Sequence, residues 1–333
     1  MRTIIGAVLS ILVVSATMAQ SPRLARNPDT LPAAPEGGFR FVVISDLNSA
    51  YGSTEYNEHV HALVRRIIEE IKPSIVVSAG DLVAGQKREL TEENLHAMWR
   101  AFDEVVVTPL EAAGIGFFPV PGNHDASGYP AFAREVAIYR DHWTRRARPR
   151  GAHFLNTEDY PSKYSFTAGG GLFVALDITT LDPLPESMWA FLDEELRRDH
   201  SLKFCFSHIP PYPVTIGRER ETIPSPDDDR ARDLMLEHGV TVWFTAHHHG
   251  YFKGHNRRLN LVALNCAGNG PRRLIGTESP QRQSVVVVDL LDGRLERVFA
   301  VMSDGAIFDD LTLPLRIAHD GQELLRFDQE HTE

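Results

Sequence analysis

Residues 41–46 read Phe-Val-Val-Ile-Ser-Asp, four apolar side chains followed at once by a small polar residue and a carboxylate. A short, continuous apolar run of this kind is typical of a strand that is buried on both faces. The same pattern returns at Ile75–Val77, which leads into Asp81, and at Ile115–Val120, which leads into Asn123. We therefore expect three buried strands that each end at a polar side chain.

Helical patterns separate and follow these runs. Apolar residues recur every three or four positions in Tyr56–Ile71 and again in Glu92–Ala113, where Val105–Val107 and Pro109 predict an interruption. Further helices are expected at Glu186–Arg198 and Asp227–His238, further strands at Leu202–Phe206, Val240–Phe244, Leu259–Leu264, Ser284–Leu290 and Leu295–Met302, and a hairpin at Lys163–Phe166 and Leu172–Asp177. This interleaving indicates a layered α/β fold with one mixed sheet or two packed sheets.

The composition is that of an acidic globular protein. The 333 residues are 43% hydrophobic, which suffices for a continuous core. The chain has 34 lysines and arginines against 45 aspartates and glutamates, and the net charge of −11 argues against binding to duplex nucleic acid. Two cysteines are too few for a four-cysteine zinc site, whereas 15 histidines supply many nitrogen donors.

The first 19 residues have the pattern of a secretory signal peptide. Arg2 precedes the apolar run Ile4–Val14, and small residues ending at Ala19 follow, where a signal peptidase would cut. The run is about half the roughly 20 residues that a membrane span needs, so we expect a periplasmic or secreted protein with no stable membrane span after cleavage, an uncleaved anchor being the alternative. The expected organisation is a signal peptide at 1–19, an extended lead-in at 20–39 and a single domain at 40–333.

Export would permit a disulfide between Cys205 and Cys266. Both cysteines lie in apolar segments, however, which favours buried free thiols.

Each predicted buried strand in the first 250 residues, apart from the hairpin, ends at a side chain that can bind a metal. These residues are Asp46, Asp81, Asn123, His208, and His247 with His249. Because ligands collect at the carboxyl ends of strands in open α/β sheets, we expect these side chains to converge. His247 and His249 should point the same way, as alternate residues of an extended segment do. Oxygen and imidazole donors suit zinc, manganese or iron, and their number predicts two ions that share a bridging carboxylate.

These residues resemble the motifs of the calcineurin-like metallophosphoesterase family. The family's Asp-x-His, Gly-Asp, Gly-Asn-His-Asp/Glu, later His and Gly-His-x-His are present here, in order, as Asp46-Leu47-Asn48, Gly80-Asp81, Gly122-Asn123-His124-Asp125, His208 and Ala246-His247-His248-His249. The match spans residues 46–249, with spacings long enough for strand–helix–strand crossovers. The resemblance implies an α/β/β/α sandwich of two packed mixed β-sheets.

The resemblance also implies a ligand set for two divalent or mixed-valence ions of manganese, iron or zinc. Asp46, Asp81 and His249 would hold the first ion. The second ion would be held by Asp81, Asn123, His208 and His247, so that Asp81 bridges the two.

Two further positions have an implied role. His124 is not a ligand in the family and would stabilise the phosphoryl charge or protonate the leaving oxygen. Asn48 stands where the family commonly has a metal-binding histidine; it would bind through its amide oxygen, hold a metal-bound water, or leave the first ion weakly bound.

We therefore expect an exported metal-dependent phosphoesterase that cleaves phosphomonoesters or phosphodiesters of a small substrate by attack of a metal-bound hydroxide. The alternatives are a metal- or phosphate-binding module in which Asn48 has weakened catalysis, and a hydrolase of a non-phosphate substrate. The chain has Ala84 where the related purple acid phosphatases have a tyrosine, and it lacks the Asp-Arg-Gly signature of the serine/threonine phosphatases. Protein dephosphorylation is therefore not the first choice, and the sequence does not indicate the oligomeric state.

Overall fold

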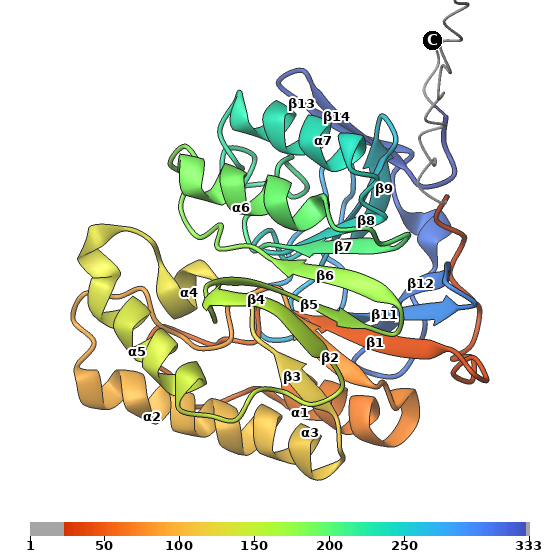
Figure 1. Cartoon of the computed structure of the whole chain (residues 1–333). Coiled ribbons are helices and arrows are strands. Elements are labelled where there is room, and N and C mark those ends of the chain that lie inside the picture. Colours follow the sequence, from red (N-terminus) through yellow and green to blue (C-terminus); the bar gives the residue numbers. More distant parts are fainter. Residues whose placement is uncertain (1–22, 331–333) are drawn as a thin grey trace, which may run out of the picture.

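The computed structural model describes residues 23–330, so the predicted signal peptide lies outside it. Within that range two mixed β-sheets pack face to face, with helices on both outer faces (Figure 1). This confirms the expected α/β/β/α sandwich. No helix in the described range is long and apolar enough to span a membrane.

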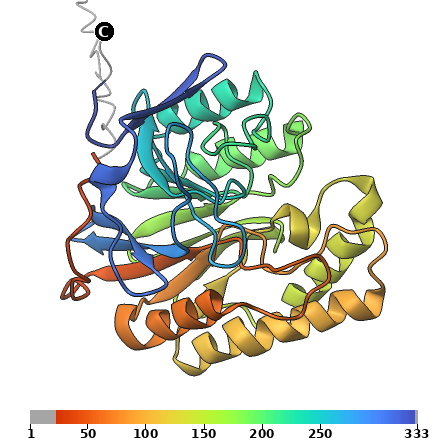
Figure 2. The same ribbon diagram turned by 180° about the vertical axis from the view of Figure 1, so that it is seen from behind.

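The first sheet has the strand order β12-β11-β1-β2-β3. Its parallel part consists of β1 (Phe39–Ile44), β2 (Ile75–Ser78) and β3 (Gly116–Phe118), the three runs that open the chain. The C-terminal strands β11 (Ser284–Leu291) and β12 (Arg294–Met302) add antiparallel neighbours beside β1. Both views show the N-terminal segment and the C-terminal strands on the same side of the molecule (Figures 1 and 2).

The second sheet has the order β13-β14-β9-β10-β8-β7-β6-β5-β4. Its parallel centre is β6 (Gly171–Ala175), β7 (Lys203–Phe206), β8 (Val242–Thr245) and β10 (Leu259–Ala263). The remaining strands are β4 (His153–Asp159), β5 (Lys163–Ala168), β9 (Phe252–Asn256), β13 (Arg316–His319) and β14 (Gln322–Arg326).

Aromatic side chains fill the space between the sheets. The ring of Phe41 on β1 meets those of Phe173 and Phe204 on the opposite sheet edge-on, with centroids 5.0 and 5.3 Å away. Phe206 and Phe244 extend the same cluster. Edge-to-face contacts of this kind add to the stabilisation from buried area, and they fix how the two sheets face each other.

Helices cover the outer faces of both sheets. The first sheet is covered by α1 (Glu58–Arg66), α2 (Glu92–Phe102), α3 (Thr108–Ala112) and α5 (Ala133–Thr144), and the second by α6 (Glu186–Leu196) and α7 (Asp227–Glu237) (Figure 1). The predicted interruption near Pro109 is a π-helical turn at Asp103–Val107 that joins α2 to α3. Pro109 is the second residue of α3, directly after this turn.

Strands β9, β13 and β14, the short helix α4 (Asn123–Ala126) and the 3₁₀ turn at Pro130–Phe132 were not predicted, and neither were helix α5 and strand β4. Helix α5 has a weak apolar pattern, and β4 at His153–Asp159 is only half-buried, so neither shows strong periodicity. Cys205 and Cys266 are both buried free thiols in the structure.

A buried ion pair ties the first strand to the C-terminal strands. Arg40 and Asp289 are direct cross-strand partners of β1 and β11, and their side chains are 2% and 0% exposed. Arg40 donates to both carboxylate oxygens, from Nε at 2.6 Å and from Nη2 at 2.9 Å. Arg297 donates to the same carboxylate from the neighbouring strand.

We predict that Asp289→Ala lowers the free energy of unfolding by about 3–5 kcal/mol, because it leaves the Arg40 charge buried without its partner. Urea denaturation followed by circular dichroism measures the change. The control is Glu296→Ala on the exposed face of β12, where a change within about 0.5 kcal/mol is expected. Equal effects of the two substitutions would contradict the prediction.

Candidate metal centre

Two glycines let the ends of β2 and β3 approach closely. A side-chain carbon on Gly80, which has φ +93°, would lie 2.6 Å from Cα of Gly122. A side-chain carbon on Gly122 would lie 2.1 Å from the backbone nitrogen of Asp81. Only glycine fits at both positions, and the close approach brings Asp81 and Asn123 together.

The backbone turns sharply at four of the predicted ligands. Asp46, Asp81, His247 and His249 have φ values of 51°, 57°, 66° and 53°, in the left-handed region. Non-glycine residues reach this region at a cost, and such conformations gather at functional sites. His247 and His249 therefore do not face the site as alternate residues of an extended strand, which corrects the reason given for their common direction. The left-handed backbone conformation at each histidine turns its side chain toward the site.

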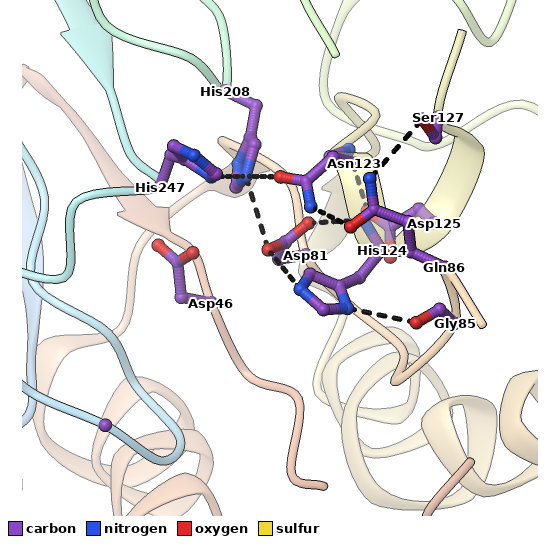
Figure 3. A network of polar contacts seen from close by, with 12 residues as sticks. Asp46, Asp81, Gly85, Gln86, Asn123, His124, Asp125, Ser127, His208 and His247 are labelled. Carbon is purple, nitrogen blue, oxygen red and sulfur yellow. Dashed lines mark hydrogen bonds and ion pairs between the residues drawn. The ribbon is translucent and has the colours of Figure 1, made fainter. Parts of the chain in front are cut away.

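Four side chains from the two sheets meet around Nε2 of His208 (Figure 3). That atom lies 2.9 Å from Oδ1 of Asn123, 3.1 Å from Nδ1 of His247 and 3.2 Å from Oδ2 of Asp81. The ligand atoms of Asp81, His208 and His247 all lie within 4.8 Å of one another. The structure thus brings together the four residues predicted to hold the second ion.

The residues predicted for the first ion lie next to this group. Nε2 of His249 is 3.2 Å from Oδ1 of Asp46, whose side chain is fully buried. Neither carboxylate oxygen of Asp46 receives a hydrogen bond of good geometry within residues 23–330. A buried carboxylate without donors is costly unless a cation compensates its charge, so this donor set fits a metal ion.

Asn48 lies two residues beyond Asp46 in the same buried segment. It is 8% exposed, and its side-chain amide forms no hydrogen bond with any residue in the described range. The amide is therefore free to face an ion or a water, and its role as a ligand stays a prediction.

Hydrogen bonds on the outer side of each imidazole select the nitrogen that faces the site. Nδ1 of His208 lies 2.8 Å from the carbonyl of Ala79, and Nδ1 of His249 lies 2.9 Å from that of Gly270. A carbonyl only accepts, so Nδ1 carries the hydrogen and Nε2 is left to bind a metal. His247 is reversed, because its Nε2 faces the Glu221 carboxylate at 2.9 Å and its Nδ1 faces His208.

Two of the supporting residues could not be recognised in the sequence. Oε1 of Gln86 accepts from the Asn123 amide at 2.6 Å, which leaves Oδ1 of Asn123 toward His208. Glu221 holds His247 from a loop 26 residues away in the chain.

His248 points away from the site, where its Nδ1 accepts from the backbone N–H of Val214.

His124 lies at the edge of the cluster with its ring held in place. Its backbone N–H donates to Oδ1 of Asp81 at 2.9 Å, and its Nδ1 lies 3.0 Å from the Gly85 carbonyl (Figure 3). The ring is 15% exposed, and its Nε2 lies 3.8 Å from Oδ2 of Asp81. The ring of Tyr51, 56% exposed, lies 5.1 Å from that of His124, so this tyrosine lies beside the cluster.

The buried charges shift one another's pKa values. Burial alone would raise the pKa of Asp81, but the positive charges of His208 and His124 hold it well below its usual range. Burial would lower the pKa of His208, but the Asp81 charge and hydrogen bond raise it to about 9. Burial, followed by the charges of His208 and Arg218, lowers the pKa of His247. Asp81 therefore stays ionised at neutral pH and can bind cations.

Asp125 holds the loop that carries Asp81 in place through buried hydrogen bonds. Its carboxylate accepts from the backbone N–H groups of Leu82, Val83 and Gly122, which fixes the loop that carries Asp81. Burial, and then the negative charge of Asp81, raise the pKa of Asp125 to about 7.

Asp81→Asn should remove both metal ions together, because Asp81 is the carboxylate predicted to bridge them. Elemental analysis of the purified protein would show the loss. The matched control is Asp177→Asn, which changes a half-buried carboxyl just after β6, bonded to Thr179 and outside the cluster. Full two-ion occupancy in Asp81→Asn would rule out the bridging role.

Comparison with known proteins shows the same family as the sequence motifs. The profile of the calcineurin-like phosphoesterase family matches residues 39–251. The chain is 25% identical over 284 residues to the serine/threonine-protein phosphatase CPPED1 of Bos taurus, an alignment that covers 78% of this chain and 80% of that protein.

Solved structures share the fold at low sequence identity. The purple acid phosphatase PPD1 from yellow lupin (Lupinus luteus) superposes with a TM-score of 0.62 at 17% identity, over 82% of this chain and 53% of that one. GAP50, described as the anchor in the inner membrane complex of Plasmodium, superposes with a TM-score of 0.53 at 11% identity, over 81% of this chain and 87% of that one.

Proposed function

Because the chain belongs to the calcineurin-like phosphoesterase family and is a hydrolase of phosphoric ester bonds, we propose that it is an exported enzyme that hydrolyses phosphate esters with hydroxide generated at a pair of metal ions. The observation that carries the proposal is the position of Asp81. Its carboxylate lies 3.2 Å from Nε2 of His208, next to the pair formed by Asp46 and His249, and in the proposal this one carboxylate would serve both ions.

The residues present suit the chemistry of such ions. Two divalent ions would lower the pKa of a bound water and neutralise phosphate oxygens during in-line attack. The surrounding chain supplies the arrangement: buried carboxylates, imidazoles with fixed ring hydrogens, and an amide oxygen held by Gln86. Groups that are held before the substrate arrives need no reorganisation during the reaction.

His124 is the residue suited to handle the leaving group. Nδ1–H of His124 donates a hydrogen bond to the Gly85 carbonyl. Nε2 is therefore the ring nitrogen that remains for proton transfer, at the partly exposed edge of the cluster. An imidazole is suited to donate a proton near neutral pH.

The natural substrate is proposed only by class. The class is a small phosphate ester, and the name of the bovine relative adds phosphorylated serine or threonine as a candidate. Export rests on the signal-peptide pattern of residues 1–19; N-terminal sequencing of the native chain, expected to begin at Gln20, tests it.

The direct test is turnover of an aryl phosphate and of its diester counterpart by the full chain. Chelation should abolish activity, and manganese, zinc or iron should restore it. Tight binding of two ions without turnover of either substrate would instead support the alternative of a binding module, in which Asn48 has cost catalysis.

His124→Ala should lower kcat by on the order of 10² to 10⁴ for a phosphate ester with a poor leaving group, since the lost proton donor matters most there. Metal content, measured in parallel, should not change. The control is His61→Ala, which replaces an exposed histidine of α1. Unchanged turnover of the poor substrate by His124→Ala would exclude the general-acid role.

A further inference from the structure

Tyr51 is an exposed aromatic side chain beside the histidine proposed to serve the leaving group. Its ring centroid lies 5.1 Å from that of His124, and the two rings are inclined by 34°, so one side of the tyrosine ring faces the imidazole. The residue is nevertheless 56% exposed, and it is the one aromatic among the exposed large apolar residues of the described range. The greater part of Tyr51 is therefore open to contact with another molecule.

The turn that carries Tyr51 is fixed to a neighbouring segment. The backbone N–H of Gly52 donates to the carbonyl of Ala84 at 2.7 Å. Gly52 has φ +80°, and a side-chain carbon there would lie 2.6 Å from Cδ2 of Leu90, so the turn packs closely against that segment. A ring presented by a turn held in this way is in position before a ligand binds, which lowers the entropic cost of binding.

A second contact holds the loop of Tyr51 at both of its ends. Nδ2 of Asn269 donates to Oγ of Ser49 at 3.1 Å, and Oδ1 of Asn269 accepts from Nδ2 of Asn57 at 2.9 Å. Two separate parts of the chain, the segment at 84–90 and Asn269, therefore fix the path of residues 49–57.

The segment that holds this turn also positions His124. The carbonyl of Ala84 accepts from the turn, and the carbonyl of the next residue, Gly85, accepts from Nδ1 of His124 at 3.0 Å (Figure 3). Two successive carbonyls thus set the position of Tyr51 relative to His124. Nε2 of the histidine lies 3.8 Å from Oδ2 of Asp81. The aromatic ring, the proposed proton donor and the predicted bridging carboxylate therefore follow one another across the edge of the metal centre.

This order determines what the leaving group of a substrate would meet. If Nε2 of His124 donates the proton, the leaving oxygen lies next to that atom. The rest of the leaving group then extends outward past the imidazole, on the side where Tyr51 lies. An aromatic group can stack on a tyrosine ring or meet its edge, which adds attraction beyond that from buried area, whereas an aliphatic group gains only the buried area.

We propose that Tyr51 forms the subsite for the leaving group and makes this enzyme prefer phosphate esters with an aromatic leaving group over those with an aliphatic one. The inference rests on the proposed function and names its substrate class, a small aryl phosphate ester. Phosphorylated serine and threonine have aliphatic leaving groups and would be the poorer class of substrate.

The test compares phenyl phosphate with a fluoroalkyl phosphate whose leaving alcohol has similar acidity, in the metal-loaded full-length protein. Tyr51→Ala should lower kcat/KM for phenyl phosphate by about 5- to 20-fold, because the ring contact and its buried area are lost. For the fluoroalkyl ester the loss should not exceed about twofold. Tyr51→Phe, which keeps the ring, should keep the preference for phenyl phosphate.

The comparison separates binding of the leaving group from a positioning effect on His124. A tyrosine that only held the imidazole would give equal losses on the two esters in Tyr51→Ala, and that result would overturn the proposal. The control is Leu311→Ala, which removes another exposed apolar side chain and should leave both rates unchanged. Equal losses on phenyl phosphate in Leu311→Ala and Tyr51→Ala would also contradict the proposal.

A binding measurement separates this inference from the proposed function. Phenylphosphonate and methylphosphonate carry a P–C bond in place of the ester bond, so the ring of the first occupies the position of a leaving group. Calorimetric titration should show about a fivefold or greater loss of affinity for phenylphosphonate in Tyr51→Ala and none for methylphosphonate. If the unmodified chain hydrolyses no ester, the proposed function fails, and the titration still decides whether Tyr51 binds an aromatic group. Unchanged affinity of Tyr51→Ala for phenylphosphonate would reject the subsite.

Discussion

The arrangement of the centre depends on buried negative charge at the junction of two β-sheets. Asp46 and Asp81 are buried, and no residue in the described part of the chain donates a hydrogen bond of good geometry to Asp46. Such carboxylates are tolerated when a cation is present, and the strand ends of both sheets deliver imidazoles and an amide to the same place. Packing of Phe41 against the opposite sheet sets the distance over which those donors can meet.

Much of this could be predicted because it is local in the sequence. A buried strand is a run of apolar residues, and the polar residue that ends it is visible in the same window. The sequence therefore predicts that Asp46, Asp81, Asn123 and His208 converge, and the structure brings these side chains to the same edge of the sheets. The two-sheet packing came from the family resemblance, because the apolar pattern alone allowed one sheet or two.

What escaped prediction depends on contacts between distant segments. Gln86, Glu221 and Arg218 lie in loops without periodicity, and only the folded chain shows which side chain each one meets. The contact between the rings of Tyr51 and His124 is also visible only in the folded chain, because it joins two segments that are distant in the sequence. The π-helical turn at Asp103–Val107 was read as a break because β-branched residues and a proline disfavour a helix, yet tertiary packing carries the helix through.

The four predicted ligands with left-handed backbone lower the stability of the protein, while their side chains are needed for the proposed metal centre. Glycine at Asp46, Asp81, His247 or His249 would relax a backbone conformation that costs of order 1 kcal/mol or more at a non-glycine residue, but each replacement would remove a predicted metal ligand. Selection for a sturdier apo-protein would therefore favour losing the centre, one ligand at a time. The four residues thus lower the stability of the apo-protein, a cost that metal binding by the same side chains would offset.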